Sequence, residues 1–458
     1  MLLERERMIG RVSFVLAGIF IGAFLFNLVS MTRVSAVAAD SSLYKELQLI
    51  GDVFERIHSN YVSPVNDKKL IESGIDGMLS SLDPHSGYMK PEEVASMSNE
   101  VKGEYGGLGL EVTLENNLIK VISPIDDTPA FRAGIFSGDF ISEINGKSVR
   151  GLRLDEAVNK LHGEVNTKVT LTVLRKGANK PLKFVIQRKI IPIINVKYRV
   201  DNGDIGYLRI TSFTGKVDSQ LSNAVEKIKK SVLSDNLKGY VLDLRLNPGG
   251  FLDQAISVAD YFLEKGEIVS TRGRKPEETQ RFNASPGDII DGKPMIVLID
   301  GGSASASEIV AGALQDLKRA VILGTRSFGK GSVQTIITLG DQGALRLTTA
   351  LYYTPSGRSI QGTGIDPDIL VKQPLPKELQ EKFSAIGESA LVGHIKGQRE
   401  TEKGSGSFSY IPQDVKDDVQ LNYAFDLLRG KREYPASISS NVKSNVKLIQ
   451  SSDYAARQ

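Results

Sequence analysis

The stretch from Met295 to Gln334 constrains the fold more than any other part of the chain. A short apolar run at 295–299 predicts a buried strand, and no side chain in residues 301–307 is larger than a hydroxymethyl group. Such small residues allow a tight turn and the close approach of another segment. Apolar residues at helical spacing follow from Glu308, and a second strand is predicted at 320–324. Several hydrolase folds place a nucleophilic serine at such a strand-to-helix turn.

Two polar residues of this stretch, Ser305 and Lys330, also have structural explanations. Ser305 and Glu308 match a capping box, in which the serine caps a helix, and an isolated lysine is often a solvated charge. Residues 324–330 begin like a phosphate-binding loop, but Gly331 stands where that loop requires serine or threonine. The residues after it are strand-like instead of helical. Nucleotide binding is therefore rejected.

Three sequence blocks resemble the signatures of the carboxyl-terminal processing proteases, also called tail-specific proteases. They are Asn247-Pro248-Gly249-Gly250, residues 302–309 (Gly-Ser-Ala-Ser-Ala-Ser-Glu-Ile) and residues 328–334 (Phe-Gly-Lys-Gly-Ser-Val-Gln). The resemblance implies that Ser305 is the nucleophile, that Lys330 is the general base and that Gln334 positions the lysine. It also implies an oxyanion hole formed by the N–H groups of Ala306 and of either Gly249 or Gly250.

The residue types of this implied site suit proteolysis. A serine hydroxyl is a weak nucleophile until a base takes its proton, and serine–lysine pairs are one such arrangement. The base must be uncharged, so the pKa of Lys330 has to fall from about 10.4 toward about 7–8, which corresponds to roughly 4 kcal/mol. This requires desolvation without a partnering carboxylate. Gln334 can orient the amine without adding charge.

Residues 101–190 resemble a PDZ domain, a β-rich module that binds peptide C-termini as an added strand. Loop amides of such a domain hold the peptide carboxylate, and an adjoining apolar groove favours a small or aliphatic terminal side chain. By resemblance the loop consists of Gly106, Gly107, Leu108, Gly109 and Leu110. Relatives often carry arginine where this chain has His162, so a coupling to the active site through that arginine cannot be carried over. A structural β-domain is the alternative.

Residues 1–39 predict an export signal or a membrane anchor. Three arginines precede an apolar run over 12–29, and Ala36-Val37-Ala38 follows as a small-x-small cleavage pattern. The run is also close to the length of a membrane-spanning helix. In either case the rest of the chain is expected in the periplasm or on the extracytoplasmic face of the cytoplasmic membrane.

The other segments complete the predicted organisation. Residues 40–100 form a helical region, with a second helix at 68–82 that ends in Leu-Asp-Pro-His-Ser; by resemblance this region often mediates dimerisation. Residues 191–374 alternate strands and helices, which predicts an α/β core, by resemblance similar to the crotonase and Clp-protease folds. Residues 375–458 are expected to be partly flexible, with a linker at 384–407 and a helix at 419–428.

Composition excludes several kinds of chemistry. The chain has no cysteine, which rules out disulfides and thiolate sites, and its four histidines argue against a histidine metal cluster. No cofactor or metal is expected. A net charge of +3 over 458 residues gives no indication of nucleic-acid binding.

The sequence thus predicts an exported serine endopeptidase that cleaves proteins near their C-termini. Its PDZ domain would recognise the substrate tail and regulate activity, with a homodimer and an adaptor protein as expected partners. Three alternatives remain open. These are an inactive PDZ scaffold, an acyl-transfer enzyme of crotonase-like fold, and a hydrolase in which His85 replaces the lysine in a Ser-His-Asp triad.

Overall fold

The computed structural model describes residues 43–380, 385–397 and 406–435, so the predicted signal at 1–39 lies outside the described residues. The chain divides into two compact units, residues 1–77 and 78–458. In the first unit, residues 43–60 are helical and α2 (Asp67–Ser80) begins after a break, which confirms the two predicted helices. Within the described ranges, no helix combines the length and the apolar composition needed to cross a lipid bilayer.

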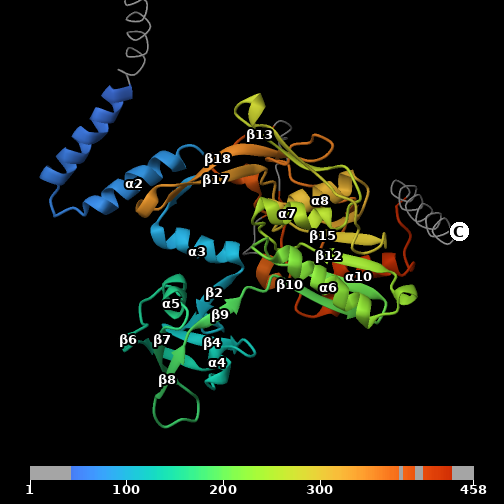
Figure 1. The fold of residues 1–458 in the computed structure, drawn as a ribbon, viewed down its shortest axis with the longest axis horizontal. Helices are drawn as coiled ribbons and strands as arrows, with labels where there is room; N and C mark the ends of the chain where they lie inside the picture. Colours follow the sequence, from blue (N-terminus) through green and yellow to red (C-terminus); the bar gives the residue numbers. More distant parts are fainter. Residues whose placement is uncertain (1–42, 381–384, 398–405, 436–458) are drawn as a thin grey trace, which may run out of the picture. The chain divides into compact units, whose positions relative to one another are not determined.

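A mostly parallel six-stranded sheet forms the centre of the second unit (Figure 1). Its strands, in spatial order, are β10 (Val196–Asp201), β11 (Ile205–Ile210), β12 (Gly239–Asp243), β15 (Met295–Ile299), β16 (Val321–Gly324) and β19 (Ile369–Leu370). Only β10 runs antiparallel. A helix lies in each connection from β11 to β16, whereas the connection from β16 to β19 runs through strands of a second sheet. The carboxyl ends of parallel strands meet at one edge, where loops gather and ligands bind in such sheets.

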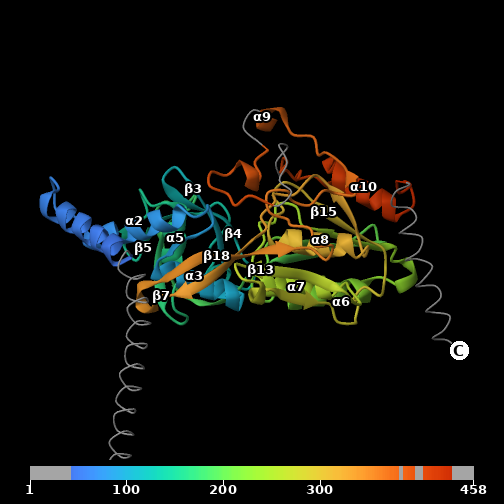
Figure 2. The same ribbon diagram turned by 90° about the horizontal axis from the view of Figure 1, so that it is seen from above.

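Helices cover both faces of this sheet. One face packs against α6 (Val217–Ser231), α7 (Leu252–Asp260) and α8 (Ala306–Asp316), and the other against α10 (Val419–Leu428), as Figure 2 shows. Successive strand residues point to opposite faces. Val297 therefore belongs to the first apolar cluster, and its neighbours Ile296 and Leu298 belong to the second. This double coverage explains why these strands are continuous apolar runs in the sequence.

A buried arginine fixes α10 to the sheet. The guanidinium of Arg245 is fully buried and donates to Asp243 Oδ2 at 2.7 Å and to Asp418 Oδ2 at 2.8 Å, and Asp418 is the N-cap of α10. Opposite charges around it hold the pKa of Arg245 above its usual value in spite of burial. Asp243 and Arg245 thus have a structural role, which is to hold the start of α10 against the sheet.

A second, antiparallel sheet carries the lysine segment. Its strands are β1 (Gly87–Met89), β18 (Ala344–Tyr353), β13 (Glu267–Gly273), β14 (Gln280–Asn283) and β17 (Ser332–Thr338). Gln334 on β17 pairs in register with Thr348 on β18, and β1 pairs with the beginning of β18. The sheet thereby brings the Leu-Asp-Pro-His-Ser turn beside residues 330–334.

The PDZ domain has its own apolar core. The elements of this domain are β3 (Leu110–Glu115), β4 (Leu118–Pro124), α4 (Pro129–Arg132), β5 (Phe140–Ile144), β6 (Lys147–Ser148), α5 (Leu154–Leu161), β7 (Lys168–Leu174) and β8 (Leu182–Gln187). A two-stranded ribbon of β2 (Glu104–Gly107) and β9 (Lys189–Pro192) joins it to the rest of the unit. The helix α3 (Pro91–Lys102) leads into this ribbon.

The observed architecture confirms the predicted fold class: an α/β core, an inserted β-rich PDZ domain and N-terminal helices. Several elements were not anticipated. They are α3, β13, β14, the short helix α9 (Lys377–Gln380) and the 3₁₀ helices η1 (Ser234–Asn236), η2 (Pro276–Glu278), η3 (Gly340–Gln342), η4 (Glu388–Ala390) and η5 (Val415–Asp417).

The linker prediction for residues 384–407 is wrong at Glu388. This residue is fully buried, and its backbone N–H donates to Phe328 O at 2.9 Å. Its neighbours are rich in glycine, serine and charge, so composition alone gave no sign of a buried contact here.

Candidate active site

Ser305 occupies a strained turn between β15 and α8. Its φ of 55° and ψ of −112° lie in a region that residues other than glycine rarely adopt. The small residues before it make the turn feasible, because Ser303 packs fully buried and donates its hydroxyl to Leu244 O at 2.8 Å. The turn therefore presents Ser305 at the carboxyl edge of the parallel sheet, as in other strand–serine–helix arrangements.

The capping explanation of Ser305 holds for its backbone but not for its hydroxyl. The Ser305 N–H donates to Glu308 Oε2 at 2.8 Å, whereas the Ser305 side chain makes no capping hydrogen bond. Burial raises the pKa of Tyr352 to about 12, and an interaction with the Ser305 side chain lowers it by less. The Ser305 hydroxyl therefore lies beside a phenol that stays protonated.

Lys330 lies partly buried beside an uncharged partner. Its Nζ donates to Gln334 Oε1 at 2.6 Å. Burial lowers the pKa of Lys330; the negative charge of Glu388 opposes this effect, and the positive charge of Arg346 adds to it. A lowered pKa increases the fraction of Lys330 that is uncharged and able to accept a proton.

The amide of Gln334 is held in one orientation. Its Nε2 donates to Ser332 Oγ at 3.0 Å and to Thr348 Oγ1 at 3.1 Å, so its oxygen faces the lysine. The Thr348 hydroxyl in turn donates to Asp83 Oδ1 at 3.1 Å. The Leu-Asp-Pro-His-Ser turn is thereby connected to the lysine through two intermediate side chains.

Glu308 joins the serine segment to the lysine segment. Its fully buried carboxylate accepts from Ser305 N and Lys330 N through one oxygen, at 2.8 and 2.9 Å. The other oxygen accepts from Gly329 N at 2.7 Å and from Ser327 Oγ at 2.5 Å. Burial raises the pKa of Glu308 to about 7, although all four donors favour the carboxylate. One side chain thus fixes both backbones relative to each other.

The N–H groups expected to form the oxyanion hole lie around this turn. Gly249 packs directly against the serine, since a Cβ added there would lie 2.8 Å from Ser305 Cβ and 3.0 Å from Ala306 N. The Gly249 N–H, however, donates to Asn247 Oδ1 at 2.9 Å. In the described part of the chain, neither Ala306 N nor Gly250 N donates to any acceptor. These two groups are therefore available to a developing oxyanion.

His85, the alternative base, is engaged elsewhere. Its Nε2 lies 2.8 Å from Glu388 Oε2, and Gln361 Nε2 donates to Glu388 Oε1 at 2.9 Å. No hydrogen bond connects His85 to Ser305 among the residues described. No group of three or more acidic or histidine side chains in those residues is arranged to hold a metal ion.

Comparison with known proteins identifies the family of this chain. Residues 204–371 match the model of Peptidase family S41, residues 106–185 a PDZ domain, and residues 23–93 the N-terminal domain of the activating protease CtpB. The chain is 59% identical over 429 residues to a carboxy-terminal-processing protease of Bartonella bacilliformis, covering 94% of this chain and 98% of that protein. The chain belongs to the carboxy-terminal-processing proteases of peptidase family S41. It is a serine-type endopeptidase, as the sequence predicts.

Two further relatives have lower sequence identity to this protease. A probable CtpA-like serine protease of Staphylococcus aureus is 39% identical over 331 residues, or 72% of this chain and 65% of that protein. The solved structure of a photosystem II D1 C-terminal processing protease is 27% identical and covers 72% of this chain and 95% of that chain, with a TM-score of 0.41.

Three side chains of this protease site were not predicted from the sequence. Glu308 was noticed only as a capping partner, although its position three residues after Ser305 was the available signal. Thr348 and Glu388 gave no signal, because each reaches the site from a distant segment. Their contacts depend on the pairing of β17 with β18 and on the packing of residues 385–397.

The amide of Gln334 offers a test of how the lysine is tuned in this protease. We expect Gln334→Glu to shift the rising limb of the kcat/KM profile to higher pH by about 1–3 units, because a carboxylate stabilises the adjacent ammonium and raises its pKa. Activity at neutral pH should fall accordingly. The pH profile of peptide cleavage measures this shift, with Thr335→Glu on the exposed side of β17 as the matched control. An unchanged profile would show that Gln334 does not influence the pKa of the group whose ionisation limits the rate.

Proposed function

We propose that Ser305 and Lys330 form the catalytic dyad of this protease. The observation that carries the proposal is the shared Glu308 carboxylate, which binds the backbone N–H groups of both residues. In the first step, neutral Lys330 Nζ accepts the hydroxyl proton while Ser305 Oγ attacks the scissile carbonyl. The N–H groups of Ala306 and Gly250 then stabilise the oxyanion.

The remaining steps return both residues to their starting forms. The ammonium of Lys330 gives its proton to the leaving amine, which breaks the peptide bond and leaves an acyl ester on Ser305. Water then attacks the ester, and the lysine takes one proton from it and returns it to Ser305 Oγ. Hydrolysis thus consumes one water and requires no cofactor group in these steps.

The hydrogen bond made by Lys330 Nζ bears on how the proposed dyad becomes active. Lys330 Nζ donates to Gln334, and no hydrogen bond joins it to Ser305 Oγ within the described ranges. We propose that Lys330 Nζ turns from Gln334 toward Ser305 Oγ before proton transfer. We propose that binding of a substrate tail to the PDZ domain favours the active arrangement, since a ligand shifts a two-state equilibrium by its difference in affinity.

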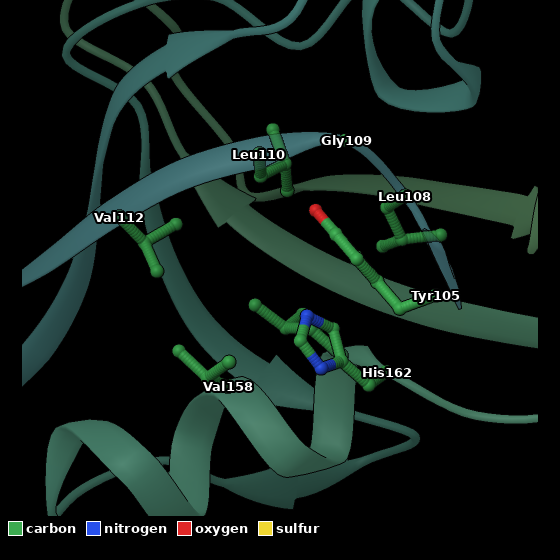
Figure 3. A pocket seen from close by; sticks show the side chains of 8 residues that line it. Tyr105, Leu108, Gly109, Leu110, Val112, Val158 and His162 are labelled. Atoms are coloured by element: carbon green, nitrogen blue, oxygen red, sulfur yellow. The ribbon is translucent and has the colours of Figure 1, made fainter. Parts of the chain in front are cut away.

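The PDZ loop has the features of a carboxylate site. The carbonyls of Leu108 and Gly109 accept from Ala130 N and Ile125 N, both at 2.9 Å, so the loop is tied back to the domain. The N–H groups of Leu108 and Gly109 donate to no acceptor among the described residues. Such N–H groups at the end of an apolar groove suit a peptide C-terminus (Figure 3).

Amidation of a substrate tail tests this proposal. Removing the negative charge should weaken binding about tenfold or more, because hydrogen bonds to a charged group contribute roughly 1.5–3 kcal/mol each. Kinetics of one peptide with free and amidated ends distinguish two roles of the domain. If the domain only recruits the substrate, amidation should raise KM. If the domain also switches the core to an active arrangement, amidation should lower kcat as well. A variant lacking residues 106–188 should not distinguish the two peptides. Equal kinetics for both peptides in the parent protein would show that the enzyme does not read the tail.

We also propose that residues 1–39 direct the protease out of the cytoplasm. Three arginines followed by the apolar run at 12–29 support this location outside the cytoplasm. Deleting the segment should leave the product in the cytoplasmic fraction, and the parent protein should be digested when spheroplasts are exposed to external protease. Protection of the parent protein in intact spheroplasts would contradict the outward-facing location.

A further inference from the structure

A chain of hydrogen bonds leads from the buried carboxylate of Asp83 to the amine of Lys330. Thr348 Oγ1 donates to Asp83 Oδ1 at 3.1 Å, and Gln334 Nε2 donates to Thr348 Oγ1 at 3.1 Å. At the other end of the amide, Lys330 Nζ donates to Gln334 Oε1 at 2.6 Å. We propose that Asp83 and Thr348 are positioning residues, which fix the direction of this chain so that the Gln334 amide turns its oxygen toward the lysine. The inference rests on the proposed role of the lysine as the general base.

The carboxylate of Asp83 can only accept hydrogen bonds in this site. Its Oδ1 accepts from the backbone N–H groups of His85 at 2.8 Å and Ser86 at 2.9 Å, and its Oδ2 accepts from Ser86 Oγ at 2.7 Å. Burial opposes the charge, but the hydrogen bonds from Ser86, His85 and Thr348 outweigh burial and hold the pKa of this carboxyl below its usual value. The group is therefore ionised at neutral pH and has no proton to donate.

This acceptor determines how the Thr348 hydroxyl is turned. A threonine hydroxyl carries one hydrogen and two lone pairs. Its hydrogen is directed to Asp83, and the Ser86 hydroxyl, 3.4 Å from Thr348 Oγ1, gives its own hydrogen to the same carboxylate. Only lone pairs of Thr348 remain for Gln334. The amide therefore turns its NH₂ group, and not its oxygen, toward the threonine.

The second partner of the amide does not select this direction. Gln334 Nε2 donates to Ser332 Oγ at 3.0 Å, but a serine hydroxyl can rotate and donate to an amide oxygen equally well. The shape of the site does not select it either, because the oxygen and the NH₂ group of an amide have nearly the same size. The direction thus depends on the ionised Asp83, acting through Thr348.

The direction of the amide matters for proton transfer at Lys330. With its oxygen toward the lysine, the amide leaves the lone pair of the neutral amine available for the proton of Ser305, and it stabilises the ammonium once that has formed. With its NH₂ group toward the lysine, the amide would donate to this lone pair or face the ammonium with a second donor. A reversed amide should therefore lower both the pKa of the lysine and the rate of acyl transfer.

Other charges around the lysine act whichever way the amide points. They belong to Glu388, to Arg346 on β18 and to Glu308 on α8, and the charge of Asp83 also favours the ammonium. A variant that keeps all four charges therefore isolates the effect of the hydrogen-bond chain. Thr348→Val is such a variant, because it removes one hydroxyl and keeps the branched shape of the side chain.

The test is the pH dependence of cleavage of one quenched peptide. Thr348→Val should lower kcat about tenfold with little change in KM, because a hydrogen bond that orients the amide is lost. It should also move the rising limb of the kcat/KM profile to lower pH by about 1 unit, because the ammonium loses its acceptor. Thr348→Ser keeps a hydroxyl and should restore both values. Thr349→Val removes a hydroxyl from the exposed side of β18 and should change neither.

A second background shows whether Thr348 acts through the amide. A carboxylate has an oxygen on each side and therefore no direction to fix. In Gln334→Glu, measured at the higher pH at which its lysine is neutral, adding Thr348→Val should not lower kcat further. If Thr348→Val does not fold, Asp83→Asn weakens the same chain at its other end, and should lower kcat in the parent protein but not in Gln334→Glu.

Three results would overturn the proposal while the dyad stands, with Lys330→Ala inactive. The first is an unchanged pH profile in folded Thr348→Val, and the second is an equal loss of kcat in the parent protein and in Gln334→Glu. The third is an equal loss in Thr348→Ser and Thr348→Val, which would assign the effect to packing instead of the hydroxyl. If folded Lys330→Ala retains cleavage, the proposed base is wrong, and the inference fails with it.

Discussion

Replacing either Ser305 or Lys330 by alanine is expected to reduce peptide cleavage by at least roughly 10³-fold while the protein remains folded. Without Ser305 there is no nucleophile to form the acyl ester, and without Lys330 no neutral base accepts its proton. Because the two residues act as one unit, the double variant should be little worse than either single variant. Initial rates on a quenched peptide, with circular dichroism as the control for folding, measure both effects.

The same measurement decides between the two candidate bases. His85 contacts Glu388 and not Ser305 in this structure, so His85→Ala should retain far more activity than Lys330→Ala. The opposite order, with cleavage retained by folded Lys330→Ala and lost in His85→Ala, would replace the dyad by a histidine-based triad.

The second large effect is expected at Glu308. Glu308→Ala leaves four donors without an acceptor in a fully buried site, and each unsatisfied group costs about 1–3 kcal/mol. We therefore expect a marked loss of stability. Glu308→Gln keeps the shape but turns an NH₂ group toward at least one N–H donor, which should separate the Ser305 and Lys330 segments. A fall in kcat of about 10² is expected from such a misplacement.

Two comparisons make the Glu308 prediction specific. Glu226→Gln makes the same chemical change on the exposed surface of α6 and should leave kcat and the midpoint of thermal unfolding unchanged. Full activity of Glu308→Gln would show that the backbone N–H groups find their positions without the carboxylate.

The pKa of Glu308 adds a dependence of stability on pH. Its folded-state value of about 7 lies above the ordinary 4.5, so the folded protein binds the proton more tightly than the unfolded chain. The contribution of this group to stability is therefore fully present below about pH 4.5 and is lost as the pH rises through about 7. Glu308→Gln should flatten this part of the stability profile, as denaturant unfolding at several pH values would measure.

The sequence was sufficient to predict those elements whose signals are local. The strand at 295–299 and the helix at 419–428 have the bounds expected from the sequence. The strand-to-helix turn at Ser305 was also predicted, and in the structure it follows β15 at the carboxyl edge of the parallel sheet. These features depend on periodicity and on turn residues within a few positions of one another.

Contacts between distant segments could not be predicted in the same way. Asp83 and Thr348 are 265 positions apart, and His85 and Glu388 are 303 positions apart. Each contact arises from strand pairing or loop packing that a single sequence does not reveal. The polar support around Lys330 is therefore a finding of the structure, while the residues it supports were predicted from the motif blocks.

The most direct test of the proposed activity is the mass of the products formed from an unstructured polypeptide. Purified protein should release fragments that derive from the C-terminal part of a substrate with a free tail, and should release far less from the same substrate with an amidated tail. Ser305→Ala should release none. Cleavage that persists in folded Ser305→Ala, or fragments distributed along the substrate irrespective of its tail, would contradict the assignment of a serine protease that processes C-termini through this site.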